Sequence, residues 1–297
     1  MKPQSELFLK QIQDENADVR YTAWIRTGEM DPEVIPELGK LLTTAPPGVR
    51  RAAEEALKNA VHSVGKDPLA AKRPAVVKQL IALTEDGHPT WTRTIALRHL
   101  SLIGGDETVT AAAKLLRNAE LQEEAVFCLE RIPGSASTQA LMAGFPDVSD
   151  GFKPRVLAAL GHRGDEQATD LCARAITSPN MDIALAGMKA LARIGKKPSM
   201  EVKPPNSDSL ESWQKVEYTD SVLRYADEQI RRGNPKHAVE TLQGFLNRPE
   251  EHLQCAAIVS LSKVNTPEAA ALIATKLNSD NRTVRITAAK AKAAMTR

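Results

Sequence analysis

One short motif recurs along the chain and constrains its fold more than any other feature. Residues 18–23 and 283–289 both contain Val-Arg, followed by Ala three residues after the Arg. With this Arg taken as position zero, the register recurs at intervals of 30, 43, 29, 31, 31, 70 and 31 residues. A nearly constant interval of this length indicates a repeat protein. Position zero is occupied by Arg20, Arg50, Arg93, Gln122, Lys153, Ala184, Gln254 and Arg285.

The motif has the spacing of one helix face. The residue before position zero is apolar in seven of the eight copies, and Leu stands seven residues after it in six. These offsets place the side chains on one side of an α-helix. Three residues after position zero the side chain is small, because a helix packed closely between neighbours has no room for a larger group. The residues there are Ala23, Ala53, Ala96, Ala125, Val156, Gly187, Ala257 and Ala288.

Most copies are followed by a break and a second apolar-periodic segment. The breaks contain Gly, Pro, Asn or Asp, which end one helix and begin the next. The unit is therefore a pair of antiparallel helices, and such pairs bury their apolar faces by stacking. The expected second helices lie at 34–42, 76–83, 109–116, 168–176 and 269–277.

The motif resembles the HEAT repeat, in the short bacterial form also found in phycobilin lyase subunits. The matching stretches are 18–23, 48–57, 92–109 and 283–289. The resemblance implies an all-α fold, a right-handed α-solenoid of about 8–9 HEAT-like repeats of stacked antiparallel helix pairs. It does not imply one function, because unrelated proteins use this architecture.

Two long intervals mark irregular places. The first contains an extra stretch at 58–75, which is expected to lengthen a helix or add a loop. The second contains a Pro-rich insertion at 196–212, whose Pro198 and Pro205 break any helix. The segment 225–246 after it keeps a helix-turn-helix pattern and also resembles a tetratricopeptide unit. No shift in composition marks a boundary, so residues 1–297 are predicted to form a single domain.

Composition and charge narrow the function classes. The net charge is only +2, from 39 basic and 37 acidic residues, so binding to nucleic acid is not favoured. No apolar run is long enough to span a membrane, and the first residues do not form a signal peptide, so a cytoplasmic location is expected, with a chain trimmed of its signal peptide as the alternative. The three cysteines, Cys128, Cys172 and Cys255, are far apart and lie in helical patterns, which indicates reduced thiols.

Local catalytic and metal motifs are absent from the sequence. There is no His-Glu dipeptide of the kind that binds iron in HEAT-like hydroxylases, no phosphate loop and no nucleophile motif. We therefore expect no metal and no cofactor, and a non-catalytic protein. Trp24, Trp91 and Trp213 are candidates for stacking on a ligand, but Trp91 is interpreted as a packing residue between repeats.

The sequence favours a scaffold that presents a concave helical surface to a protein or peptide. Two alternatives stay open: a lyase-type or chaperone-like subunit that binds a tetrapyrrole or other small ligand in the groove, and a nucleic-acid-binding protein. The exposed positions of the second helices carry six basic and three acidic residues, so a mildly acidic partner is expected. The residues predicted to bind it are Lys78, Lys114, Arg117 and Arg174, with the 196–212 loop as a flap.

The Arg residues at position zero have a different predicted role. Arg20, Arg50, Arg93 and Arg285 are interpreted as structural, pairing with acidic or carbonyl groups of the loops between repeats, such as those of Asp18 or Asp280. Replacement of this Arg by Gln, Lys or Ala in other copies fits a structural position better than a ligand site.

Overall fold

The computed structural model describes residues 2–65, 71–203 and 205–295, and all regular structure in these ranges is helical. The predicted all-α class of stacked helix pairs is therefore confirmed. We call the helix that carries the motif the A helix and the helix that follows it the B helix. The A helices are α2 (Ala17–Trp24), α4 (Pro47–Gly65), α6 (Thr90–Ile103), α8 (Gln122–Arg131), α10 (Lys153–Arg163), α12 (Met181–Ile194), α13 (Ser212–Arg231), α15 (Glu251–Ser262) and α17 (Arg282–Met295).

The B helices have 7 to 12 residues, and each follows an A helix. They are α3 (Ile35–Thr44), α5 (Arg73–Ala82), α7 (Asp106–Lys114), α9 (Ser135–Gly144), α11 (Thr169–Ala175), α14 (Pro235–Leu246) and α16 (Pro267–Ala274). Helix α1 (Pro3–Ile12) precedes the first pair. Single 3-10 turns are η1 (Thr27–Glu29), η2 (Pro32–Val34), η3 (Leu115–Arg117), η4 (Phe145–Asp147), η5 (Glu166–Ala168) and η6 (Ser207–Ser209).

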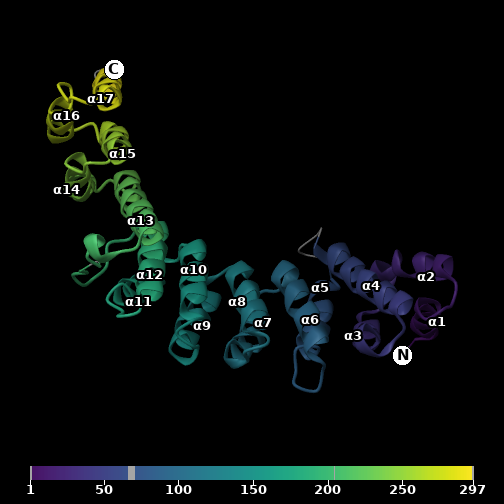
Figure 1. Cartoon of the computed structure of the whole chain (residues 1–297). Helices are drawn as coiled ribbons and strands as arrows, with labels where there is room; N and C mark the ends of the chain where they lie inside the picture. Colours follow the sequence, from purple (N-terminus) through teal and green to yellow (C-terminus); the bar gives the residue numbers. More distant parts are fainter. Residues whose placement is uncertain (1, 66–70, 204, 296–297) are drawn as a thin grey trace. The chain divides into compact units, whose positions relative to one another are not determined.

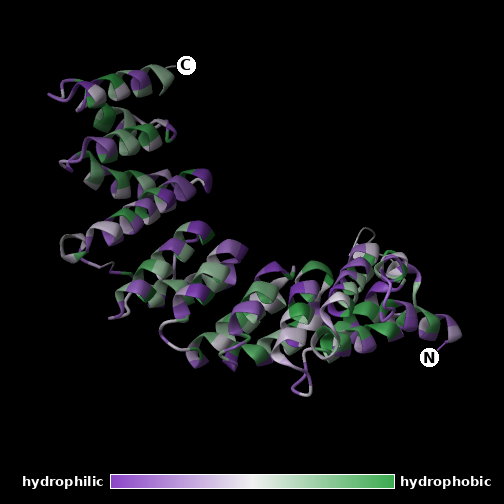
Figure 2. Ribbon diagram, turned by 45° about the vertical axis from the view of Figure 1, so that its right-hand side comes forward, coloured by the Kyte–Doolittle hydropathy of each residue, from purple (hydrophilic) through white to green (hydrophobic). Residues whose placement is uncertain are grey.

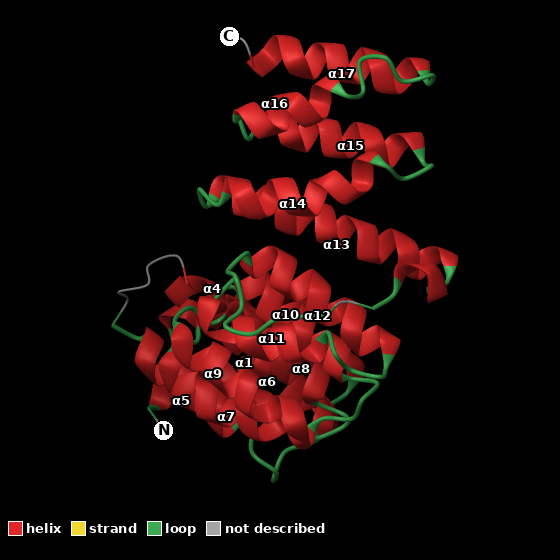
Figure 3. Ribbon diagram, turned by 90° about the vertical axis from the view of Figure 1, so that its left-hand side faces the viewer, coloured by secondary structure: helices red, strands yellow, loops and turns green. Residues whose placement is uncertain are grey.

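The chain divides into two compact units, residues 1–149 and 150–297, which we call the N-terminal and C-terminal units. In the N-terminal unit, α2, α4, α6 and α8 pack in sequence as one layer, and α3, α5, α7 and α9 as a second layer. In the C-terminal unit, α10, α12, α13, α15 and α17 form the A layer, and α14 packs on α16 in the B layer (Figures 1 and 3). The prediction of a single domain over the whole chain stays a prediction.

The small residue of the motif lies at the closest helix contacts. Ala53, Ala96 and Ala125 have no exposed surface, and the equivalent residues of the other copies are buried as well. Where the residue is Gly187, an added Cβ would lie 2.9 Å from the carbonyl oxygen of Cys172 and 3.0 Å from Cβ of Ala175. Buried apolar residues from the helices form the core of each unit, and hydrophobic and hydrophilic residues alternate along the helix ribbons in Figure 2. The helices are therefore spaced by the size of this side chain.

The first long interval is explained by helix α4. This helix has 19 residues and continues to Gly65, so the extra stretch at 58–75 lengthens a helix, as one of the two sequence expectations states. Residues 66–70 of that stretch lie outside the described residues. Helix α5 begins at Arg73, where its first turn contains a proline.

The second long interval, between Ala184 and Gln254, contains an additional A helix, α13, and within the described residues no B helix follows α12. Helix α13 packs on both α12 and α15, and its Ala226 is fully buried, as the small residue of the motif would be. The A helix α12 is followed by the 196–212 loop, whose described residues contain only the turn η6. The loop is held against α11, since Ser199 donates to Asp170 through its backbone N–H (2.9 Å) and its hydroxyl (2.7 Å). Leu210 is buried.

Side chains of α13 complete the C-terminal end of α12. Gln229 Nε2 donates to the carbonyl oxygen of Gly195 at 2.5 Å, and Arg232 Nη2 donates to that of Ile194 at 2.7 Å. These carbonyls have no acceptor role within the helix, so the donors satisfy groups that would otherwise be unpaired. Gly195 adopts φ +70°, and an added Cβ would lie 1.9 Å from Cγ of Glu228. This position therefore requires Gly for both backbone conformation and space.

Gly195→Ala should destabilise the protein by about 3 kcal/mol, because it combines left-handed backbone strain with a collision against α13. The matched control is Gly233→Ala. Gly233 has φ +76°, but an added Cβ there would meet no atom within 4 Å, so only the backbone cost of about 1 kcal/mol applies. Urea denaturation of both variants measures the difference. Equal destabilisation would show that the contact with Glu228 does not limit this position.

Ala96→Leu should destabilise the protein by roughly 1–3 kcal/mol, because Ala96 is fully buried and its helix α6 packs on both α4 and α8, which leaves no room for a larger side chain. The exposed Lys114→Leu should change the free energy of unfolding by less than about 0.5 kcal/mol. Thermal and urea melts of the two variants test the assigned register, and a neutral Ala96→Leu would disprove it.

Candidate functional site

In several copies the side chain at position zero of the motif binds the loop that precedes its A helix. Arg20 Nη1 donates to the carbonyl oxygens of Asp14 (2.7 Å) and Glu15 (2.8 Å). Arg285 Nη1 makes the same contacts with the carbonyl oxygens of Ser279 (2.5 Å) and Asp280 (2.8 Å). The acceptors are backbone carbonyls five and six residues earlier. This geometry supports the interpretation that the position is structural.

Other copies show which property of the side chain matters. Gln254 Nε2 donates to the carbonyl oxygen of Arg248 at 2.7 Å, so a neutral N–H donor can make the contact. Arg93, only 7% exposed, reaches the carbonyl oxygen of Thr84 (2.9 Å) and the carboxylate of Asp86 (2.8 Å). Arg50 is exposed, and no hydrogen bond of its side chain is recorded within the described residues, so it does not share this geometry.

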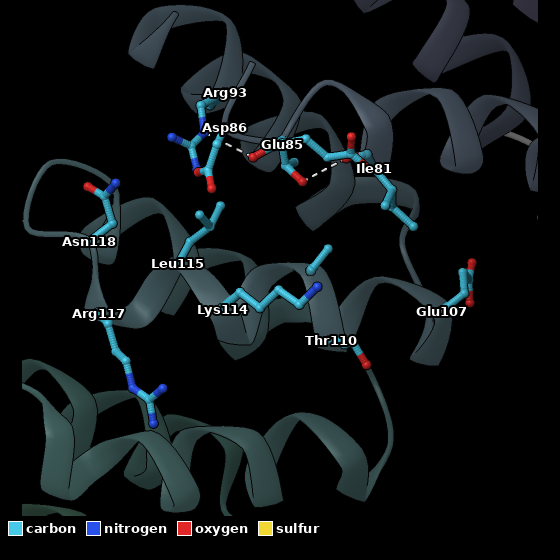
Figure 4. Close-up of a pocket in the computed structure, with 12 residues that line it drawn as sticks. Ile81, Glu85, Asp86, Arg93, Glu107, Thr110, Lys114, Leu115, Arg117 and Asn118 are labelled. Atoms are coloured by element: carbon cyan, nitrogen blue, oxygen red, sulfur yellow. Dashed lines mark hydrogen bonds and ion pairs between the residues drawn. The ribbon is translucent and has the colours of Figure 1, made fainter. Parts of the chain in front are cut away.

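Two of the predicted binding residues line one pocket of the N-terminal unit. Lys114 at the end of α7 and Arg117 in η3 lie in a pocket of about 590 Å³ formed by α5, α6, α7 and the turns beside them. Figure 4 shows Arg117 and Glu107 at opposite ends of the pocket, with Lys114 between them. The other lining residues are Ile81, Thr84, Glu85, Asp86, Arg93, Thr110, Ala111, Leu115 and Asn118.

The lining carries three acidic and three basic side chains, so it is less positive than the B helices alone predict. Arg93 pairs with Asp86, and Arg117 pairs with Asp147 of η4 at 2.6 Å. Glu107 pairs with Arg73 at 3.2 Å. Among the described residues, Lys114 is the lining cation without a recorded ion pair.

The other two predicted binding residues do not line this pocket. Lys78 is exposed on α5 but is not part of the lining. Arg174 is exposed on α11, which belongs to the C-terminal unit. It lies near Asp170, where the hydrogen bonds from Ser199, and to a smaller extent the charge of Arg174, lower the pKa of the carboxyl.

Sequence reasoning missed the acidic side of the pocket. Glu85 and Asp86 come from the turn after α5, and Asn118 from the turn after η3. Arg93 at position zero could have indicated this acidic side. Its side chain contacts the loop before its own helix, and the ion pair with Asp86 brings that carboxylate to the pocket.

The tryptophans and thiols contribute little to a site. Trp91 is 47% exposed and Trp213 is 53% exposed, so about half of each side chain is covered by the protein, and the interpretation of Trp91 as a packing residue stays a prediction. Burial raises the pKa of the Cys128 and Cys172 thiols to about 12, which makes them poor nucleophiles. Within the described ranges, no group of three or more His, Cys, Asp or Glu side chains has the arrangement of a metal site, and no helix is long and apolar enough to cross a bilayer.

Comparisons with known proteins show the fold. No family model and no curated protein matches the sequence. The solved structure of Kap121p aligns with 99% of this chain at 13% identity and a TM-score of 0.54, and the chain spans 38% of that structure. An engineered protein aligns at 20% identity (TM-score 0.42, 99% of this chain and 89% of that one). Human deoxyhypusine hydroxylase aligns at 15% identity (TM-score 0.40, 75% and 97%).

The likeness to Kap121p is too distant in sequence to carry a function. It shows that the chain is an all-α repeat solenoid of the kind seen in HEAT-repeat proteins. No family model supports the finer resemblance to phycobilin lyase subunits. Because the fold is used for many purposes, the function has to be argued from the surfaces of this chain.

The protonation of one histidine, His99, should make the stability of this fold depend on pH. His99 lies on α6, and its Nε2 is buried without a hydrogen-bond partner among the described residues. Burial, and secondarily the charges of His62 and Lys58 on α4, lowers the pKa of His99 to about 4. The imidazole is therefore neutral in the folded protein at pH values where an unfolded chain would already bind a proton.

Stability should fall as the pH is lowered from about 6.5 to 4, because the unfolded state binds a proton at His99 before the folded state does. The free energy of unfolding should fall by about 2–3 kcal/mol at the acid end of this range. Above the pKa of His99 in the unfolded chain, it should not be reduced by this group. Urea melts at a series of pH values measure this dependence. His99→Leu should reduce the slope, while the exposed control His252→Leu should keep it. An unchanged slope in His99→Leu would assign the effect to other groups.

Proposed function

We propose that this protein is a non-catalytic scaffold that binds a protein or peptide partner on its B helices. Stacked pairs present a row of B helices whose exposed positions are not needed for the core. In the N-terminal unit this row is formed by α3, α5, α7 and α9, and the pocket around Lys114 lies on it. A hollowed helical surface with several polar side chains suits an extended or helical segment of another protein.

The observation that carries the proposal is the unpaired ammonium of Lys114. The other cations of the lining hold acidic residues of the same unit, while no ion pair of Lys114 is recorded in the described part of the chain. An ammonium group in a pocket can donate to a carboxylate or a backbone carbonyl of a partner. Thr110 and Asn118 add polar groups beside it. We infer a mildly acidic segment as the preferred ligand of this site.

Three other predicted parts of the binding surface lie outside the pocket around Lys114: Lys78, Arg174 and the 196–212 loop. Lys78 adds positive charge on the neighbouring helix α5. Arg174 and the loop lie in the C-terminal unit, and the contact of Ser199 with Asp170 holds the loop on α11. A role of the loop as a flap predicts that deletion of 199–209 weakens partner binding.

The two alternative functions are separable by binding assays. A tetrapyrrole or similar ligand should raise the melting temperature of the protein if it binds specifically. Nucleic acid should bind with an affinity that falls steeply with salt concentration. The protein-binding proposal expects neither result.

Selection of a displayed library of random linear peptides against the whole protein tests the proposal. The selected peptides should be enriched in Asp and Glu, and Lys114→Glu combined with Arg117→Glu should weaken their binding at least tenfold. The control is Lys10→Glu combined with Arg51→Glu, an equal charge change at exposed positions of the same unit that lie outside the pocket. Unchanged binding to the first variant, with its melting curve intact, would exclude this pocket as the site.

A further inference from the structure

A second groove lies between two B helices of the C-terminal unit. Helices α14 and α16 pack on each other, and a groove of about 640 Å³ runs between them. Each helix contributes residues at positions i, i+3, i+4 and i+7, which is one continuous face. On α14 these are Lys236, Val239, Glu240 and Gln243, and on α16 and its C-cap they are Glu268, Ala271, Leu272 and Thr275.

The floor of this groove is apolar and held by the core beneath it. Val239 and Leu272 pack against the buried cluster of the C-terminal unit, while part of each side chain stays open to the groove. Ala271, between them in the lining, is exposed. An apolar surface lined by two helices that are fixed from below provides a preformed seat for apolar side chains. This chemistry differs from the polar pocket around Lys114.

The walls of the groove carry an acidic excess. Glu240 projects from α14 and Glu268 from α16, while Lys236 is the one basic residue of the lining. The ion pair recorded for Glu240 is with His237 at 3.8 Å, which counts only when the imidazole is protonated. For Glu268 the described residues contain no recorded ion pair. Basic side chains at the flanks of a ligand would therefore meet carboxylates on both walls.

We propose that this groove binds an amphipathic helix of a partner protein, with its apolar stripe on the floor and Lys or Arg side chains beside Glu240 and Glu268. Two parallel helical ridges accept the ridge of a third helix, and its i, i+3, i+4, i+7 side chains match their spacing. Helix α16 has eight residues, about 12 Å, so two to three turns of the partner are in contact. The proposal goes beyond the site at Lys114, since it concerns another surface and another ligand class.

Three labelled synthetic helical peptides of equal length provide the probes. The first has a Leu stripe at i, i+3, i+4 and i+7 flanked by Lys, the second has the same stripe flanked by Glu, and the third has the composition of the first in scrambled order. Fluorescence anisotropy with the whole protein measures binding. The Lys-flanked peptide should bind at least tenfold more tightly than either of the others.

Substitutions in the groove locate the binding. Ala271→Arg places a long cation on the exposed floor and should weaken binding of the Lys-flanked peptide at least tenfold. Ala289→Arg, an equal change at an exposed position of α17 outside the groove, is the control and should have no effect. Glu268→Lys should reduce the preference for Lys-flanked over Glu-flanked peptide. Circular dichroism melts verify that each variant is folded.

Several results would overturn the inference. Absence of binding, equal binding of the scrambled peptide, or undiminished binding by folded Ala271→Arg would each reject a helix-binding groove. A dimer in sedimentation that Ala271→Arg dissociates would assign the groove to a second copy of the chain and reject an external partner. Lys114→Glu combined with Arg117→Glu should leave peptide binding unchanged, so the result is independent of the first site.

Discussion

The close approach of consecutive A helices is the constraint on which the rest of the structure depends. Gly161 of α10 has room for no side chain, since an added Cβ would lie 2.7 Å from Cα of Ala190 on α12, and Ala96 and Ala125 of two other A helices are fully buried. Such contacts fix the spacing of one layer. The B helices then have to follow at the same spacing within each unit, and their outward faces become available for binding.

The repeat could be predicted because it is written twice, in the small residue and in the donor at position zero. The register was missed at one helix that keeps only one of the two. Helix α13 carries the buried Ala226 but has Leu223 three residues before it, so the Arg-based register passed over it. The loop in place of a B helix after α12 was recognised by its prolines, but its anchoring to α11 through Ser199 depends on a tertiary contact that no local pattern indicates.

The charges of the candidate site were harder to predict than the fold. The sequence identified Lys114 and Arg117, but several carboxylates that surround or pair with them, such as those of Asp86 and Asp147, come from turns, whereas Glu107 comes from α7. A count of charges on helices alone therefore overestimates the positive character of the surface. The α14–α16 groove was not predicted, because its apolar floor depends on tertiary packing that leaves Val239 and Leu272 only partly covered.

The missing B helix has a mechanical consequence for the C-terminal unit. Its A layer is continuous from α10 to α17, because α12 packs directly on α13, whereas the B layer between α11 and α14 consists of a loop held by a few hydrogen bonds. A stack of helix pairs resists bending when helices are packed in both the A layer and the B layer. At this level one side resists through packed helices and the other only through a tether. The unit should therefore bend most easily at the α12–α13 contact, because helix packing resists bending there on one side only.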